Sequence, residues 1–368
     1  MDRQAKEIGD LTDAVEIMRG DAVLCEGRMA LDCAGCVLGL RSNSAKLLEH
    51  LGNYFAHLVC EADSLDIEII AIESPVVELE NEFMDWKREP GKRGRKDAYL
   101  DLPAGRLVRK VRTGMLFLQS EPYRIAAGPC LENDNQVINF INAQYMNWLQ
   151  QRGWLICHAS GLVRHGKTLG MAGLSGGGKS TLMLQLLERE EVDYLTNDRL
   201  FIRQEAGGIV ARGIPKLPRI NPGTIVHNSR LKTLISESRR TDLLALPTQE
   251  LWELEEKYDV DVEALYGAGR IVPQAPLSAF LVLNWHRESE QPLQLRRVEL
   301  EQRRDLLSAI MKSPGPFYQY ADGRFFQDTT ELDERTYLQM LASIPIYEAS
   351  GRIDFTGLQQ YCYTEILS

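Results

Sequence analysis

Residues 173–180, which read Gly-Leu-Ser-Gly-Gly-Gly-Lys-Ser, restrict the possible folds of this chain more than any other segment. This stretch matches the pattern G-x-x-x-x-G-K-[ST] at every fixed position. Residues 167–172 before it are typical of a strand, and residues 181–187 after it are typical of a helix. Glycines in such a turn let successive backbone N–H groups surround a phosphate, and the N-terminus of the helix adds partial positive charge. The motif therefore predicts a nucleoside triphosphate site in an α/β domain.

Each fixed position of the motif has an expected role. Lys179 is expected to reach the β- and γ-phosphates of ATP, and the hydroxyl of Ser180 is expected to bind Mg²⁺. The predicted nucleotide-binding residues are Gly173, Ser175, Gly176, Gly177, Gly178, Lys179, Ser180 and Thr181. A glycine-rich turn with an accidental Gly-Lys-Ser is the structural alternative, and the flanking strand and helix argue against it.

Two further residues are candidates for the same site. The strand expected over residues 192–196 ends in Asn197 and Asp198. An acid in this position can hold Mg²⁺ or accept a proton from an attacking hydroxyl, although many such residues only form a turn or cap a helix. The strand expected over residues 155–159 carries His158, which would lie next to the loop in a parallel sheet or serve as an ordinary core residue.

The order and spacing of these segments resemble the HPr kinase/phosphorylase family, and more closely its relatives described as HPr-kinase-related kinases of type B. The resemblance covers residues 154–325 and includes Ala211-Arg-Gly-Ile-Pro215 and Leu265-Tyr-Gly-Ala-Gly-Arg270. It implies a P-loop kinase fold shared with phosphoenolpyruvate carboxykinase, Mg-ATP as the donor, a serine hydroxyl on a small protein as the acceptor, and a homo-oligomer that is commonly hexameric.

The resemblance also implies roles for individual residues. Lys179 and Ser180 would serve ATP and Mg²⁺, and Asp198 would be the base or a metal ligand. His158 would lie near the γ-phosphate, and Arg212 would act on the transferring phosphoryl group. The predicted catalytic residues are therefore Lys179, Asp198, His158 and Arg212. The predicted metal ligands are Ser180 and Asp198.

The chain departs from the family pattern at two acidic positions and in one spacing. Asn197 stands where the family has the first of two paired acids, and Val210 stands where it has a glutamate. The loss of two carboxylates argues against the reverse, phosphorolytic reaction and against HPr as the substrate. A segment around residues 221–260, rich in charges and leucine, separates the two downstream signatures. It is expected to form a substrate lid, an oligomer contact or a plain surface insertion.

Length and charge indicate the domain organisation and exclude one class of partner. The 368 residues suit two domains, a smaller α+β domain over residues 1–152 for substrate recognition or oligomerisation and a P-loop kinase domain over residues 153–368. The 42 basic and 52 acidic residues give a net charge of −10, which argues against binding of nucleic acid. Residues 87–96, KREPGKRGRK, are expected to be a solvated hairpin tip or a docking patch for an anionic substrate or acidic partner.

The sequence favours a cytoplasmic protein that does not enter a membrane. No apolar stretch approaches the ~18 residues that a membrane helix needs, and residues 1–11 lack the pattern of a signal sequence. The seven cysteines suit reduced thiols. Cys33 and Cys36 form a CxxC pair without a second pair nearby, so buried small side chains are favoured over a metal or redox site.

These observations favour a cytoplasmic, Mg-ATP-dependent kinase that transfers the γ-phosphoryl group to a hydroxyl of a protein or a small molecule. A catalytically weakened ATP-binding switch is the first alternative, motivated by Asn197 and Val210. A P-loop ATPase of the transporter type is the second, but the chain lacks an LSGGQ helix and a hydrophobic strand ending in Asp-Glu.

Overall fold

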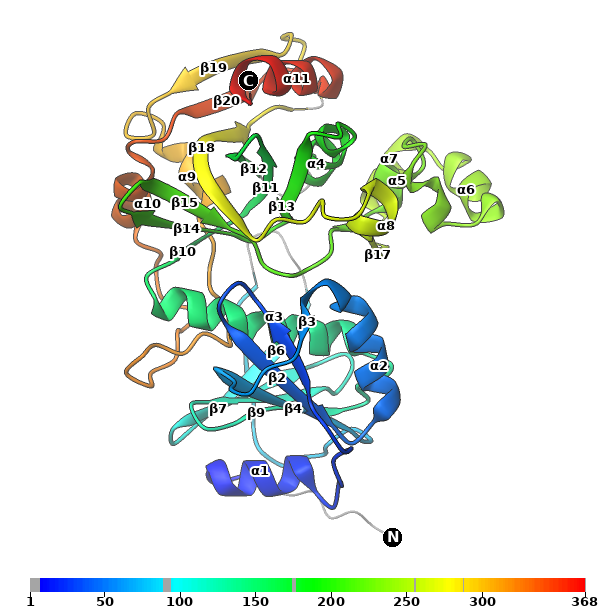
Figure 1. The fold of residues 1–368 in the computed structure, drawn as a ribbon, viewed down its shortest axis with the longest axis vertical. Coiled ribbons are helices and arrows are strands. Elements are labelled where there is room, and N and C mark those ends of the chain that lie inside the picture. The colour runs from blue at the N-terminus through cyan, green and yellow to red at the C-terminus, as the bar shows by residue number, and fades with distance from the viewer. Residues whose placement is uncertain (1–6, 89–93, 174–176, 255, 287, 368) are drawn as a thin grey trace. The chain divides into compact units, whose positions relative to one another are not determined.

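The computed structural model describes residues 7–88, 94–173, 177–254, 256–286 and 288–367. The chain forms two compact units (Figure 1). The N-terminal unit comprises Met1–Gly153 and Ser313–Glu331, and the C-terminal unit comprises Trp154–Lys312 and Leu332–Ser368. Sequence analysis assigns residues 313–331 to the second domain, whereas the structure places this segment in the first unit.

Packing of Phe317 explains this difference. Its ring contacts Phe117 and Phe140 at centroid distances of 5.6 and 5.2 Å. Its carbonyl oxygen accepts a hydrogen bond of 2.7 Å from the side-chain amide of Asn147. The segment thus contributes an aromatic side chain to the core of the N-terminal unit, and the spacing of sequence motifs gives no sign of such a return.

A nine-stranded mixed sheet forms the N-terminal unit, in the order β3-β1-β2-β4-β9-β8-β7-β6-β5. Only the β2–β4 and β4–β9 pairs are parallel. The strands are β1 (Met29–Asp32), β2 (Val37–Ser42), β3 (Val59–Cys60), β4 (Ile67–Glu73), β5 (Met84–Asp85), β6 (Asp97–Leu102), β7 (Gly105–Lys110), β8 (Leu116–Ser120) and β9 (Arg124–Gly128).

Helices α1 (Leu11–Arg19), α2 (Ala45–Tyr54) and α3 (Asp134–Gln151) pack with this sheet, and η1 (Ala56–Leu58) follows α2. Capping residues set two of the helix starts. Asp10 accepts hydrogen bonds from backbone N–H groups at the start of α1, and the Ser44 hydroxyl accepts one from Leu47 at 3.2 Å. Each of these caps pairs backbone N–H groups that the first turn of a helix leaves without a partner.

The C-terminal unit contains a second nine-stranded mixed sheet, in which β18 is shared by two groups of strands. β18 pairs with β12 and β20 in parallel and with β15 in antiparallel orientation. The strands are β10 (Leu155–Cys157), β11 (Ala159–Arg164), β12 (Lys167–Gly173), β13 (Val192–Thr196), β14 (Leu200–Glu205), β15 (Gly208–Arg212), β18 (Gln274–Leu283), β19 (Gln294–Val298) and β20 (Ile346–Ser350); β16 (Arg219–Ile220) and β17 (Tyr258–Asp259) form a separate pair.

Buried strands and an apolar helix position the predicted phosphate-binding loop. Six of the seven residues of β12 are buried, as expected for a strand covered on both faces. Helix α4 (Lys179–Leu187) buries five apolar side chains in the same core. The other helices of the unit are α5 (Pro222–Ile225), α6 (Glu237–Leu244), α7 (Thr248–Glu253), α8 (Val262–Tyr266), α9 (Leu307–Ile310), α10 (Glu334–Leu341) and α11 (Phe355–Tyr361), with η2 (Leu231–Leu234), η3 (Arg304–Leu306) and η4 (Cys362–Ile366).

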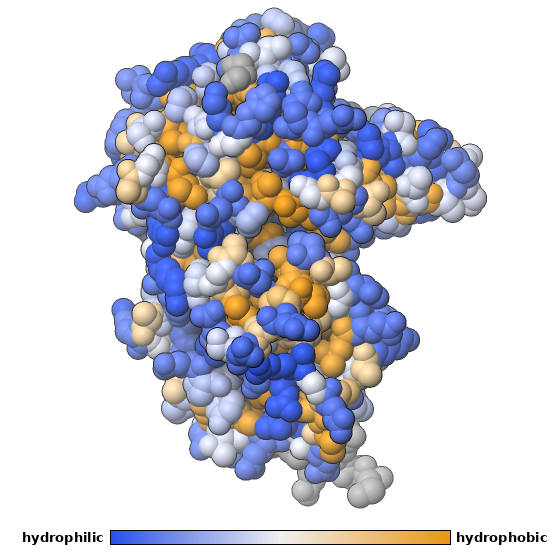
Figure 2. Space-filling model, viewed as in Figure 1, coloured by the Kyte–Doolittle hydropathy of each residue, from blue (hydrophilic) through white to orange (hydrophobic). Residues whose placement is uncertain are grey.

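The inserted segment of residues 221–260 folds as a small helical lobe of the C-terminal unit (Figure 1). Val226, Leu243 and Leu251 form its buried core. The lobe of α5, α6 and α7 is covered mainly by hydrophilic residues in the view of Figure 2. The segment is therefore a folded part of the unit with its own small core.

The structure corrects the sequence expectation around His158. The expected single strand over residues 155–159 is two strands, β10 and β11, with His158 at the bend between them. β10 pairs with β14, and β11 runs antiparallel to β12. His158 therefore does not reach the loop through a neighbouring parallel strand.

Three further sequence expectations concern the cysteines, membrane-spanning helices and the basic segment 87–96. All seven cysteines have free thiols, and Cys33 and Cys36 are buried in the turn between β1 and β2. Across the described ranges, we find no helix with the length and apolar character needed to cross a membrane. Residues 89–93 of the basic segment 87–96 lie outside the described residues, and the segment's docking role stays a prediction.

Candidate functional site

The turn from β12 into α4 depends on glycine at position 178. Gly178 has φ of 86°, in the left-handed region, and a Cβ atom there would lie 2.5 Å from the ring of Phe355. The carbonyl of Gly177 accepts a hydrogen bond of 2.9 Å from the indole N–H of Trp285. Ser175 and Gly176 fall outside the described residues, so their predicted role stays untested.

The polar side chains at the start of α4 link this turn to its surroundings. Lys179 Nζ donates to the carbonyl oxygen of Gly173 at 2.5 Å, which folds the side chain back along the loop. The Ser180 hydroxyl donates to Asn197 Oδ1 at 3.0 Å. The Thr181 hydroxyl lies 3.1 Å from that of Thr224 in the insertion. The first turn of α4 thus contacts both the end of β13 and the helical lobe.

Asn197 joins two strands to the helix. Its Oδ1 accepts hydrogen bonds from Ser180 at 3.0 Å and from Ser160 on β11 at 2.9 Å. A neutral amide oxygen thus occupies the place where the family pattern has an acid. Ser160 was not predicted to belong to the site, and no sequence motif marks it.

Asp198 lies in a strained turn and is held by His158 and Arg199. Its φ is 84°, which is uncommon for a residue with a side chain. Oδ1 lies 3.1 Å from His158 Nε2, and Oδ2 lies 3.0 Å from Arg199 Nε. Desolvation raises the pKa of the Asp198 carboxyl, but Arg199, His158 and Lys312 outweigh it and hold the pKa well below its usual range. The structure therefore brings His158 and Asp198 together, by a route the sequence did not predict.

The Arg-Gly signature contributes a close backbone contact. A Cβ atom at Gly213 would lie 1.9 Å from the carbonyl oxygen of Leu195, so only glycine fits beside the end of β13. Three residues later, the carbonyl of Lys216 accepts a hydrogen bond of 2.8 Å from Tyr194. Burial lowers the pKa of Lys216 to about 8, although Asp198 acts in the opposite direction. Lys216 is thus a cation of the site that sequence analysis missed, because an isolated lysine in a loop carries no pattern.

The guanidinium of Arg212 interacts with residues outside the predicted site. It lies 4.7 Å from the ring centroid of Trp154 and donates to Gln274 Oε1 through Nε at 3.1 Å. Neither Trp154 nor Gln274 belongs to the predicted catalytic set. The proposed action of Arg212 on a phosphoryl group therefore stays a prediction.

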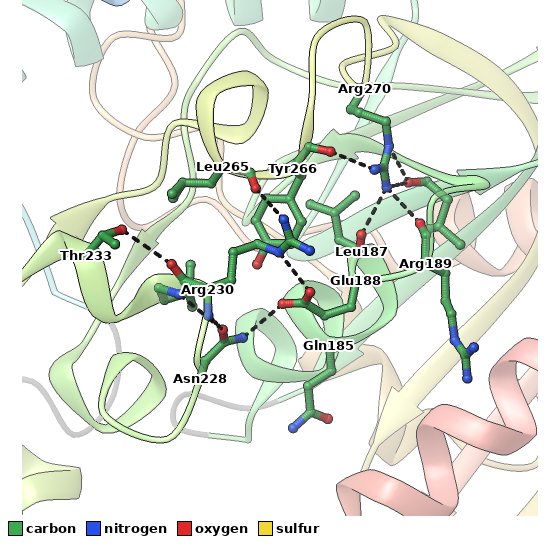
Figure 3. Close-up of polar contacts among 12 residues, drawn as sticks. Gln185, Leu187, Glu188, Arg189, Asn228, Arg230, Thr233, Leu265, Tyr266 and Arg270 are labelled. Carbon is green, nitrogen blue, oxygen red and sulfur yellow. Dashed lines mark hydrogen bonds and ion pairs between the residues drawn. The ribbon is translucent and has the colours of Figure 1, made fainter.

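The second signature stretch supports α4 from its C-terminal end (Figure 3). Arg270 donates to the carbonyl oxygens of Leu187 at 2.9 Å and Arg189 at 2.8 Å, where the helix leaves its last carbonyls unpaired. Gly267 and Gly269 adopt φ of 114° and 76°, which explains the glycines in this stretch. The signature has a structural role here, since it fixes the helix that follows the predicted loop.

An open cavity lies against the first turn of α4. Its volume is about 980 Å³, and Gly177 through Thr181 form part of its wall. The rest of the wall comes from Gln185 and Glu188 near the end of α4, from β16, from the insertion, and from Arg352, Ile353 and Phe355 at the start of α11. A cavity of this size, next to a helix N-terminus, is suited to a nucleotide.

The oxygen atoms next to this turn fit a magnesium ion. Ser180 and Asn197 offer a hydroxyl and an amide oxygen, and Asp198 follows directly in the chain. Mg²⁺ prefers such hard oxygen ligands and is often bound by few protein groups together with substrate phosphates. No cluster of three or more histidine, cysteine or acidic side chains suited to a metal is found within the described part of the chain.

Comparisons with known proteins include a distant structural likeness. No family model matches this chain, and no curated protein sequence matches it. Among solved structures, the HPr(Ser) kinase/phosphatase from Coxiella burnetii aligns with 57% of this chain and 91% of its own, at 14% identity and a TM-score of 0.28. A TM-score this low does not establish a shared fold, so the function has to be inferred from the site itself.

Proposed function

We propose that the C-terminal unit is a Mg-ATP-dependent kinase that transfers the γ-phosphoryl group to a hydroxyl of a protein or a small molecule. The hydrogen bond of 3.0 Å between Ser180 and Asn197 carries this proposal. It joins the N-terminus of α4 to the strand end that bears Asp198. Donor-binding and acceptor-activating groups then share one site.

The donor half would be built from the turn and the first residues of α4. The ammonium of Lys179 would exchange the carbonyl of Gly173 for the β- and γ-phosphates, and backbone N–H groups of the helix would bind phosphate oxygens. Mg²⁺ would be held by Ser180 and Asn197 together with phosphate oxygens. It would supply positive charge that neutralises the triphosphate.

The acceptor half would be centred on Asp198. Its depressed pKa keeps the carboxylate ionised at neutral pH, so it can accept a hydrogen bond from the acceptor hydroxyl and orient its oxygen. The hydroxyl oxygen attacks the γ-phosphorus, the bond to the bridging β–γ oxygen breaks, and ADP leaves. The hydroxyl proton passes to Asp198 late in the step and then to solvent, while His158 and Arg199 hold the carboxylate in place.

Asn197 favours one alternative. An amide at this position removes a negative charge from the metal site, and a protein that binds ATP without turning it over would tolerate this loss. In this ATP-binding switch, bound ATP would be retained. Labelled acceptor therefore supports the kinase, unhydrolysed bound ATP supports the switch, and free phosphate alone supports an ATPase.

Substitution of Lys179 tests the proposal. We expect Lys179→Ala to reduce phosphoryl transfer by ~100-fold or more, since loss of one charge-stabilising donor commonly costs this much. The purified protein is incubated with γ-labelled ATP, Mg²⁺ and a lysate of its host, and labelled products are counted. Lys232→Ala, an exposed lysine of the insertion outside the cavity wall, is the matched control. Wild-type labelling by a folded Lys179→Ala variant would reject the proposal.

A further inference from the structure

The insertion forms a wall of the cavity that adjoins the predicted phosphate-binding turn. Its residues Thr224, Asn228, Trp252 and Lys257 line the same cavity of about 980 Å³ as Lys179. The insertion is therefore placed to contact whatever binds beside a nucleotide.

Polar contacts fasten the insertion directly to α4 (Figure 3). Arg230 Nε donates to Glu188 Oε2 at 2.8 Å, and Asn228 donates to Glu188 Oε1 at 3.3 Å. Arg230 also donates to the carbonyl oxygen of Leu265 at 2.7 Å. The wall is thus tied to the helix whose N-terminus faces the cavity.

The charges on the cavity wall are mainly positive. Lys179, Arg219, Lys257 and Arg352 line the cavity, and Glu188 is the lining carboxylate. Glu188 pairs with Arg230, and Arg219 pairs with Asp259. This local excess of cations occurs in a protein of net charge −10. A concave, cationic wall concentrates small anions.

Arg219 places part of this charge near the acceptor side of the site. Arg219 and Ser180 line the same cavity, and the Ser180 hydroxyl donates at 3.0 Å to Asn197, the residue before Asp198. Arg219 also pairs with Asp259 at 3.0 Å across the β16–β17 pair, which holds its guanidinium at the edge of the cavity. A cation here is suited to a group that enters beside Asp198.

The cavity is larger than most pockets that hold one small ligand. Pockets for one drug-sized ligand span about 300–1,000 Å³. The cavity, at about 980 Å³, lies at the upper end of this range. A neutral adenosine group does not need three cations beyond Lys179, since the helix N-terminus and the metal already neutralise the triphosphate.

On the basis of the proposed function, we infer that the acceptor is a small anionic alcohol, which carries a phosphate or carboxylate besides its reacting hydroxyl. Arg219 and Lys257 bind the anionic group, and the hydroxyl lies towards Asp198. In the transfer, the hydroxyl oxygen gains the γ-phosphoryl group, ADP leaves, and the proton goes to Asp198. The insertion is then the element that determines the acceptor.

Calorimetry on the full chain tests this inference in two steps. The first titration uses a non-hydrolysable ATP analogue with Mg²⁺; failure to bind contradicts the proposed function itself. The second adds glycerol 3-phosphate to the protein saturated with the analogue, with glycerol as the neutral control. We expect saturable binding of glycerol 3-phosphate and none of glycerol.

Variants then assign the second site. Arg219→Gln and Lys257→Gln should each weaken binding of glycerol 3-phosphate by about tenfold or more, while affinity for the ATP analogue changes less than about threefold. Lys232→Gln should change neither. The two variants lie on different segments, so misfolding of one, detected by circular dichroism, leaves the other as a test.

Three results would overturn the inference. The first is absence of glycerol 3-phosphate binding in the presence of the analogue. The second is displacement of the analogue by glycerol 3-phosphate, which means that the cations serve one shared anion site. The third is equal loss of affinity for both ligands in Arg219→Gln and Lys257→Gln, which assigns these cations to the nucleotide alone.

Discussion

Arg106 in the N-terminal unit and Asp198 in the C-terminal unit are both charged side chains with several partners, but they differ in exposure. The Arg106 side chain is 0% exposed, whereas 48% of the Asp198 side chain remains accessible. The first charge is enclosed by protein groups. The second is half exposed to solvent.

Carboxylate oxygens, carbonyl oxygens and aromatic rings surround the guanidinium of Arg106. It binds both carboxylate oxygens of Asp101 and donates to the carbonyl oxygens of Phe326 at 2.8 Å and Pro316 at 3.2 Å. The rings of Tyr99 and Phe325 lie 4.6 Å from its central carbon. These contacts bind the 313–331 segment to the sheet, so the charge has a structural role.

Asp198 differs from Arg106 because its environment favours a reactive group. Its backbone is in a strained conformation, and Arg199, His158 and Lys312 depress its pKa. Strain and a shifted pKa on a half-exposed side chain are typical of functional sites. The comparison teaches that the number of partners does not separate a structural charge from one proposed to be functional, whereas exposure and strain differ between the two.

The largest expected effect is on the structural side of this comparison. Arg106→Met leaves the carbonyl oxygens of Pro316 and Phe326 without this charged donor, whereas the half-exposed Asp101 keeps a hydrogen bond from Gln327. At ~1.5 kcal/mol or more for each hydrogen bond to a charged group, the free energy of unfolding should fall by about 3 kcal/mol. Urea denaturation measures the change. Arg324→Met, an exposed arginine of the same segment, is the control; an equal loss in both variants would contradict the assigned role of Arg106.

Asp198→Asn should mainly reduce activity, whereas Arg106→Met should mainly reduce stability. Phosphoryl transfer should fall by ~100-fold or more, because the amide cannot accept the proton of the acceptor hydroxyl. The loss of stability at neutral pH should be smaller than in Arg106→Met, since the carboxylate is half exposed. Initial rates with labelled ATP and urea midpoints on the same preparations test both expectations.

Acid titration provides a second readout for Asp198. A carboxyl whose pKa is depressed on folding stabilises the protein above its unfolded-state pKa, and this contribution is lost as the pH falls through the folded-state pKa. Below about pH 4 the wild-type protein should therefore lose stability more steeply than Asp198→Asn. If the free energy of unfolding of the two proteins fell equally steeply with pH, the ion pairs of Asp198 would be absent in solution.

The next effect concerns Lys216, whose pKa is lowered from 10.5 to about 8 by burial. Between these values the unfolded chain binds more protons than the folded one, so the free energy of unfolding should rise with pH. Lys216→Met should lack this rise. Urea midpoints of both proteins at about pH 8, pH 9 and pH 10 test this, and a constant difference would refute it. If the ammonium assists transfer, activity falls over the same window in which stability rises.

Sequence patterns predicted the elements with strong local signals. The strand over residues 192–196 and the helix after the glycine turn are present as expected. The patterns did not predict the break at His158, because the pairing of β10 with β14 depends on residues far apart in the chain.

The candidate site shows the same limit. The glycine motif and Asp198 were visible in the sequence, because their residue types and spacing reflect their local geometry. Ser160, Lys216 and the cations of the cavity wall were not visible, since each reaches the site from a different segment. The position of the 313–331 segment also depends on packing around Phe317 and Arg106, which no periodicity reveals.

Asn197→Asp should give the smallest effect and sharpens the comparison within the site itself. The new carboxylate would accept the same hydrogen bonds from Ser180 and Ser160 and add a negative charge to the expected metal site. We expect Mg²⁺ to support transfer at a several-fold lower concentration, a change of about 1 kcal/mol. The gain is limited because Asp198, the next residue, repels a second carboxylate. The Mg²⁺ dependence of the initial rate measures this change.

Asn228→Asp, which lies on the cavity wall next to Glu188, is the matched control and should not lower the Mg²⁺ requirement. An unchanged requirement in Asn197→Asp would exclude this residue from the metal site and leave Ser180 and Asp198 as the remaining ligands.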